Sequence, residues 1–113
     1  MIQEPDMEIR TGEIPFASGT HEHTIVLPFL INKPVRDAYV ALSGYEVRYT
    51  SEDHHVKRIK VMLTTRLGIY NGTGVEVIAT LHLRDRNDDD PFIGKINFVL
   101  FVIEESRIPP IIR

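Results

Sequence analysis

The sequence predicts an all-β protein, an antiparallel β-sandwich of about six strands, and three observations support this. Apolar and polar residues alternate with a period of two along much of the chain, which is typical of strands buried on one side. Glycine, proline, asparagine and aspartate interrupt the alternation at short intervals, as the turns of a sandwich require. A length of 113 residues with 42% hydrophobic and 26% charged residues suits one folded domain. We therefore expect a single domain over residues 1–113, with a flexible start at 1–6.

The first two predicted strands cover residues 7–14 and 23–31. Alternation marks the first strand, and we expect Pro15 and the small residues that follow to end it. The second strand is rich in β-branched and aromatic residues, but Pro28 has no N–H to donate to a neighbouring strand. The second strand therefore favours an edge position or a bulge.

The third and fourth predicted strands cover residues 38–49 and 56–67. In the third strand the alternation changes parity at Ser43-Gly44, and a glycine at such a change indicates a β-bulge. In the fourth strand aliphatic side chains face one side and basic side chains the other, which predicts half-burial with a basic outer face. The inward set is Ile59, Val61, Leu63 and Leu67, and the outward set is Arg58, Lys60, Met62 and Arg66.

A turn and the clearest strand follow. Asn71-Gly72 accepts the positive φ angles of a tight hairpin, so the strand over residues 75–83 should run antiparallel to the one before. Alternation in this strand is complete. The inward set is Val75, Val77, Ala79, Leu81 and Leu83, and the outward set is Glu76, Ile78, Thr80, His82 and Arg84.

The last predicted strand, over residues 94–104, follows an acidic loop at 85–93 and is apolar on both sides. Ile96, Phe98, Leu100 and Val102 oppose Val99, Phe101 and Ile103. A large exposed apolar patch usually marks a subunit contact, so we predict a homo-oligomer. The alternative is that a loop or the N-terminal strand covers the second apolar face.

Charge and composition exclude several classes of protein. A net charge of −3 and a pI near 5.9 give no overall attraction to nucleic acid or to an anionic membrane. The absence of cysteine excludes disulfides, thiolate zinc sites and a cysteine nucleophile. The sequence also lacks the apolar runs of a secretory signal or a membrane span, so we expect a soluble chain that is cytoplasmic or released without a signal.

Several motifs, taken in order, resemble the H-type lectin family, which includes snail agglutinins and the C-terminal domain of discoidins. They are a leading x-I-x-x-G-x-I strand at 8–14, an apolar strand before the Pro34 turn, a strand at 40–47, and Thr73-Gly74 before the fifth strand. The resemblance covers most of the chain. It implies an antiparallel sandwich that forms a trimer or a dimer of trimers, with sites near subunit boundaries for galactose or N-acetylgalactosamine-type ligands.

Two departures from that family concern the sugar site. In the family the fifth strand ends in an aromatic residue, often Trp, followed by His, and the matching pair here is Leu81-His82. A flat ring usually holds the apolar face of a sugar, so this chain keeps the histidine and lacks the platform. The acidic loop at 85–93 is also longer than the family's connection, and such a loop can carry its own function.

The candidate binding residues are basic and face outward on two neighbouring strands. Arg58, Lys60, Arg66, His82 and Arg84 would form a patch suited to carboxylated or sulfated sugars or to an acidic partner. The alternative is an ordinary solvated face that is neutralised by Glu76. As polar contacts to a sugar we predict His82, Arg84, Asp85, Arg58 and Lys60.

Three clusters are candidate metal sites. Asp85, Asn87 and Asp89 are spaced like the first ligands of a calcium loop, but the glycine and the final glutamate of an EF-hand are absent. Adjacent histidines in the segment 51–55 point to opposite faces of an extended chain, so a shared metal there needs ligands from elsewhere. His21 and His23 share a strand face and form the third cluster. The alternative is that they are ordinary exposed polar residues before a strand. Our expectation is no required cofactor, with calcium as the one candidate.

No nucleophile elbow, phosphate-binding glycine loop or catalytic carboxylate pair is recognisable, so we expect no enzyme. The first hypothesis is a carbohydrate-binding module that acts as a homo-oligomer on galactose-type or acidic glycans. The alternative is a structural trimerisation or receptor-binding tip module, of the kind found in phage tails or injection apparatus, without sugar binding.

Overall fold

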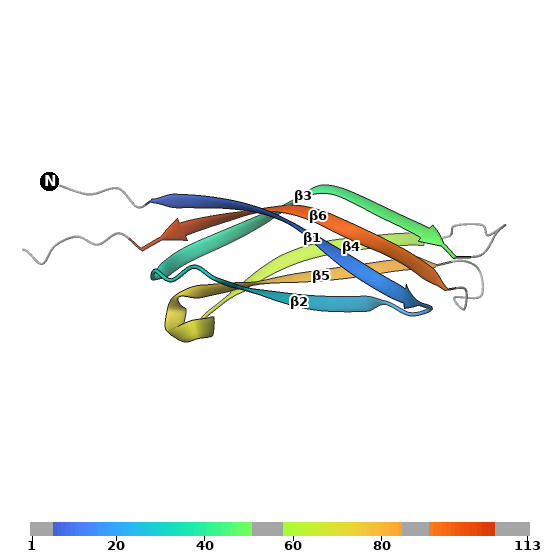
Figure 1. Cartoon of the computed structure of the whole chain (residues 1–113), viewed down its shortest axis with the longest axis horizontal. Coiled ribbons are helices and arrows are strands. Elements are labelled where there is room, and N and C mark those ends of the chain that lie inside the picture. The colour runs from blue at the N-terminus through green and yellow to red at the C-terminus, as the bar shows by residue number, and fades with distance from the viewer. Residues whose placement is uncertain (1–5, 51–57, 85–90, 106–113) are drawn as a thin grey trace, which may run out of the picture.

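Six β-strands and one 3-10 turn form two antiparallel three-stranded sheets in the computed structural model, which describes residues 6–50, 58–84 and 91–105. One sheet has the order β1-β6-β3 and the other the order β2-β5-β4, and Figure 1 shows them stacked as an elongated sandwich. The elements are β1 (Met7–Gly19), β2 (His23–Leu30), β3 (Val35–Tyr49), β4 (Arg58–Leu67), η1 (Ile69–Gly72), β5 (Gly74–Arg84) and β6 (Phe92–Glu104). The predicted all-β antiparallel sandwich is thereby confirmed. The described residues include no helix that is long and apolar enough to cross a membrane.

The core lies between the two central strands, β5 and β6. The inward side chains of β5, from Val75 to Leu83, are at most 3% exposed, as the alternation predicts. On β6 the set from Ile96 to Val102 is fully buried, and the Phe98 ring meets Phe29 edge-to-face at 5.8 Å. Burial of each such large side chain contributes about 1.5–3 kcal/mol to folding. A central strand is flanked on both sides, which explains why these two strands provide most of the core.

Both predicted proline positions lie on edge strands. Pro28 sits on β2, at the edge of its sheet, as predicted. The expected end of the first strand at Pro15 is wrong, because β1 continues to Gly19 with a register shift after Phe16. An edge strand needs hydrogen bonds on one side only, so a proline whose nitrogen faces the open side does not end it.

The predicted bulge in β3 is present, whereas the turn between β4 and β5 differs from the predicted one. The register of β3 against β6 shifts between Leu42 and Gly44, as predicted. The turn between β4 and β5 is longer than the expected tight hairpin, because η1 lies between the two strands. Positive φ angles occur at Gly68, Tyr70, Asn71 and Gly72. The two strands are nevertheless antiparallel, as predicted.

Two segment boundaries also differ from the prediction. Phe92 and Ile93, which were assigned to the acidic loop at 85–93, belong to β6 and pair with β3. At the other end, the carbonyl of Asp6 accepts a 2.9 Å hydrogen bond from the Glu104 N–H, so the last residue of the expected flexible start is fixed. Residues 1–5 and 85–90 lie outside the described residues.

Candidate functional site

Four predicted contact residues meet on the outer face of the β2-β5-β4 sheet. Arg58 is paired in register with Arg84, and Lys60 with His82, where β4 begins and β5 ends. Directly opposed residues of antiparallel strands share a face with Cβ atoms about 4.5–5.5 Å apart. Asp85, the fifth predicted contact, lies outside the described residues.

Arg66 does not belong to this group. It lies near the far end of β4, opposite Glu76, and its Nε donates a 2.7 Å hydrogen bond to Glu76 Oε1. This hydrogen bond, and then the charge of Glu76, raise the pKa of Arg66. The predicted basic patch therefore divides into three cations and a histidine at one end and a neutral pair at the other.

Glu22 completes the group and was not predicted. Lys60 Nζ donates a 2.7 Å hydrogen bond to Glu22 Oε1, which lowers the pKa of Glu22, and the charges of His82 and Arg58 lower it further. Glu22 precedes β2, whose His23 is paired with Leu81, so the chain brings Glu22 beside His82. We call Glu22, Arg58, Lys60, His82 and Arg84 the Glu22 cluster.

Glu22 lies between two histidines at the start of a strand, and this position is the only sequence signal that it belongs to a site. The prediction for this segment named His21 and His23 but not Glu22. His23 instead turns toward the interior, with its ring 5.8 Å from the buried Phe92 and nearly perpendicular to it. Strand alternation then sends Glu22 outward.

Hydroxyl groups and apolar atoms border the Glu22 cluster. Thr24 and Thr80 lie in the next cross-strand row, with their Oγ1 atoms 3.1 Å apart, and Met62 is paired in register with Thr80 and 48% exposed. The His82 ring lies 5.9 Å from Phe92, which is fully buried. The arrangement offers one carboxylate acceptor, several charged donors and small polar groups, a set that can hydrogen-bond hydroxyls and anions.

Most of the predicted metal ligands lie outside the described residues: Asp85, Asn87, Asp89 and the segment 51–55. Within the described ranges, no three histidine or carboxylate side chains lie close enough to hold an ion together.

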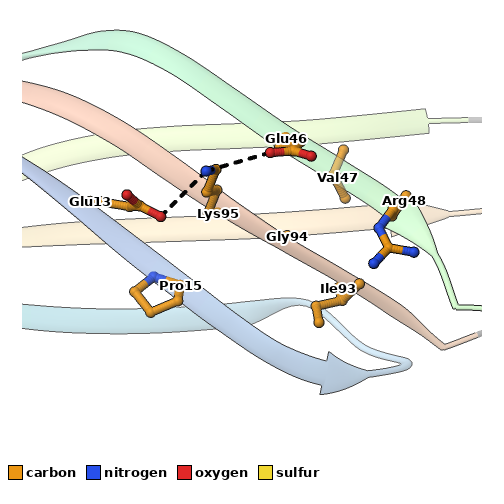
Figure 2. A pocket seen from close by; sticks show the side chains of 8 residues that line it. All are labelled: Glu13, Pro15, Glu46, Val47, Arg48, Ile93, Gly94 and Lys95. Atoms are coloured by element: carbon orange, nitrogen blue, oxygen red, sulfur yellow. Dashed lines mark ion pairs between the residues drawn. The ribbon is translucent and has the colours of Figure 1, made fainter.

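A pocket of about 220 Å³ lies on the opposite face of the molecule, in the β1-β6-β3 sheet (Figure 2). Its lining comes from three strands: Glu13 and Pro15 of β1, Ile93, Gly94 and Lys95 of β6, and Glu46, Val47 and Arg48 of β3. Lys95 lies between the carboxylates of Glu13 and Glu46, at 3.5 and 3.6 Å. None of these residues was predicted to bind a ligand.

The other half of the same face is mostly apolar, with the carboxylate of Asp37 beside Ile103 as its charged group. Phe101 is paired with Ile9 on one side and Tyr39 on the other, and Ile103 is paired with Met7. Met7, Ile9 and Tyr39 are 60%, 56% and 55% exposed. The N-terminal strand lies beside β6 in the sheet, so β1 does not cover this face. We call Met7, Ile9, Tyr39, Phe101 and Ile103 the apolar patch.

Comparison with protein-family models, with curated proteins and with solved structures found no match to this chain. The similarity to H-type lectins thus stays an expectation drawn from sequence motifs. The geometry of the Glu22 cluster and of the β1-β6-β3 face carries the functional argument.

Proposed function

We propose that this protein is a non-catalytic carbohydrate-binding module that binds glycans at the Glu22 cluster and acts as a homo-oligomer. The observation that carries the proposal is the contact of Glu22 with Lys60 beside His82. Sequence-distant strands bring an acceptor and two kinds of donor to one exposed row. Sugar hydroxyls donate and accept at once, so they need such mixed partners.

The Glu22–Lys60 pair remains accessible to a ligand. The side chains of Glu22 and Lys60 are 44% and 29% exposed, and water screens an exposed ion pair of this kind. A pair of hydroxyls could therefore bind between the carboxylate and the ammonium at little cost. The threonine hydroxyls of the next row extend the polar surface.

Arg58 and Arg84 favour acidic glycans among the possible ligands. Like charges placed directly opposite each other on two strands destabilise the pair, and a bound anion relieves that repulsion. Guanidinium groups also bind carboxylate and sulfate in a bidentate manner. The lectin resemblance supports galactose or N-acetylgalactosamine-type ligands for the same position.

Oligomerisation through the apolar patch would give such a site useful avidity. Single sugar contacts are weak, and repeated sites on one assembly add through effective concentration. The exposed side chains of the apolar patch are the surface that we assign to a second copy. The resemblance supports a trimer as the assembly.

A second candidate is a structural or receptor-binding tip module without sugar binding. One observation favours it: the residue before His82 is the fully buried Leu81, so the platform expected from the lectin resemblance is missing from the Glu22 cluster. The apolar patch would then be the main functional surface.

A glycan array followed by calorimetry distinguishes these candidates. We expect binding that Lys60→Ala and His82→Ala each weaken at least tenfold, while Arg66→Ala on the same face leaves it unchanged. No binding to any glycan of the array, together with an intact oligomer, would support the structural module instead. Equal losses in all three variants would mean that charge alone, and no defined site, holds the glycan.

A further inference from the structure

The pocket on the β1-β6-β3 face has two chemically different ends. At one end Lys95 faces Glu13 and Glu46, and at the other the guanidinium of Arg48 lies beside Ile93, as Figure 2 shows. Two carboxylates and two cations make the lining neutral as a whole. A ligand that fits both ends needs hydroxyl groups for the first and a negative charge for the second.

Lys95 keeps donors available for a ligand. Its ammonium lies 3.5 and 3.6 Å from the carboxylate oxygens, distances longer than a well-formed hydrogen bond. Glu13 and Glu46 are 54% and 67% exposed, so their remaining oxygens face solvent. This end therefore offers acceptors and donors to a hydroxyl pair without breaking a short contact.

Arg48 differs from Arg10 and Arg66, whose guanidinium groups are already paired. Arg10 pairs with Glu8 and Arg66 with Glu76 at short distance, whereas Arg48 is exposed and forms no ion pair within residues 6–50, 58–84 and 91–105. An arginine held by a strand at a pocket rim is suited to bidentate binding of a carboxylate.

The middle of the pocket is apolar and small. Pro15, Val47 and Ile93 line it together with Gly94. The volume of about 220 Å³ lies below the range of about 300–1,000 Å³ of drug-sized sites, so it suits one ring. The aliphatic side chains can contact the C–H face of such a ring.

We propose that this pocket is a second ligand site, which binds a carboxylated sugar ring, a uronic acid unit of an acidic glycan. The carboxylate binds Arg48, the ring lies over Gly94 against Pro15 and Ile93, and the hydroxyls bind Lys95, Glu13 and Glu46. The site lies on the face opposite the Glu22 cluster. It does not depend on the function proposed for that cluster.

Titration of the ¹⁵N-labelled full chain with sodium galacturonate tests the proposal. Methyl galactoside is the control without the carboxylate, and acetate is the control without the ring. We expect millimolar binding of galacturonate, with amide shifts at Gly94, Lys95 and Val47, and at least fivefold weaker binding of both controls. Arg48→Gln should weaken galacturonate binding at least fivefold, whereas Arg36→Gln, an exposed arginine on the same strand, should not.

Lys95→Met gives a second variant, which should weaken galacturonate and methyl galactoside alike. Equal affinity for galacturonate and acetate would overturn the proposal, because the ring would then contribute nothing. Shifts confined to His82 and Lys60 would also overturn it while supporting the Glu22 cluster. If no glycan binds at the Glu22 cluster while galacturonate still binds in an Arg48-dependent manner, the pocket is supported as a ligand site. The function proposed for the Glu22 cluster is then refuted.

Discussion

The two outer faces of the sandwich differ in how closely polar groups of neighbouring strands contact one another. On the β2-β5-β4 face the charges and hydroxyls form short contacts across strands, as in Lys60–Glu22 at 2.7 Å and Thr24–Thr80 at 3.1 Å. On the β1-β6-β3 face Lys95 is held loosely, and apolar side chains occupy the other half. Exposed apolar side chains also occur on the first face, among them Val26, Leu30 and Met62. The short cross-strand contacts support the proposed polar-ligand site on the β2-β5-β4 face, whereas the β1-β6-β3 face carries both the proposed pocket and the proposed assembly surface.

The largest expected effect contrasts the two sides of β6. Phe98→Ala should lower the free energy of unfolding by about 3–5 kcal/mol, because it leaves a cavity against Phe29. Phe101→Ala, on the outer side of the same strand, should cost the monomer about 1 kcal/mol or less. Urea denaturation of both variants measures the difference. Equal losses would mean that Phe101 is part of the fold rather than of a contact surface.

The next prediction concerns assembly. Phe101→Asp places a charge at the centre of the apolar patch, so it should dissociate the oligomer, as light scattering would show. Thr80→Asp makes the matched change on the opposite face and should leave the mass unchanged. A monomeric native protein at high concentration would contradict the proposed assembly.

A smaller effect concerns the pKa of Glu22. Lys60 holds it below the ordinary value of 4.5, so Lys60→Met should raise it toward that value in an NMR titration. The folded-state pKa is the lower one. The pair therefore stabilises the fold above pH 4.5, and this contribution is lost as the pH falls through the lowered pKa. An unchanged pKa in the variant would show that Lys60 does not contact Glu22 in solution.

The smallest expected effect is a difference in how salt changes the pKa values of Glu22 and Asp37, which lie on opposite faces. The pKa of Asp37 is also lowered, but mainly by hydrogen bonds from the Tyr39 hydroxyl at 2.8 Å and the Ala38 N–H. Salt screens exposed charges more than it weakens neutral hydrogen bonds. Titration in 1 M salt, where the screening length is about 3 Å, should therefore raise the pKa of Glu22 more than that of Asp37. The reverse order would contradict the view that nearby cations lower the pKa of Glu22.

The sequence was most informative where structure is local. Each residue of β5 and β6 faces the side that its parity predicts, because alternation within one strand needs no knowledge of its neighbours. The antiparallel pairing of β4 with β5 was predictable for a similar reason, since one turn joins the two strands. The continuation of β1 past Pro15 was missed, because only the sheet order shows that β1 is an edge.

Residues joined by distant strands were not predictable. Glu22 meets Lys60 through the pairing of β2 and β4 with β5, and no local pattern reports that neighbourhood. The pocket lining is drawn from β1, β3 and β6, so Arg48 and Lys95 lie far apart in sequence. Alternation places such residues on a face but does not say which partners share it.

The prolines at positions 15 and 28 have a consequence for aggregation. Each removes an N–H from an edge strand, so the β1 and β2 edges lack a continuous row of donors for a foreign strand. The other two edge strands, β3 and β4, contain no proline. Growth by strand addition, the route to fibrils, is therefore discouraged at the β1 and β2 edges.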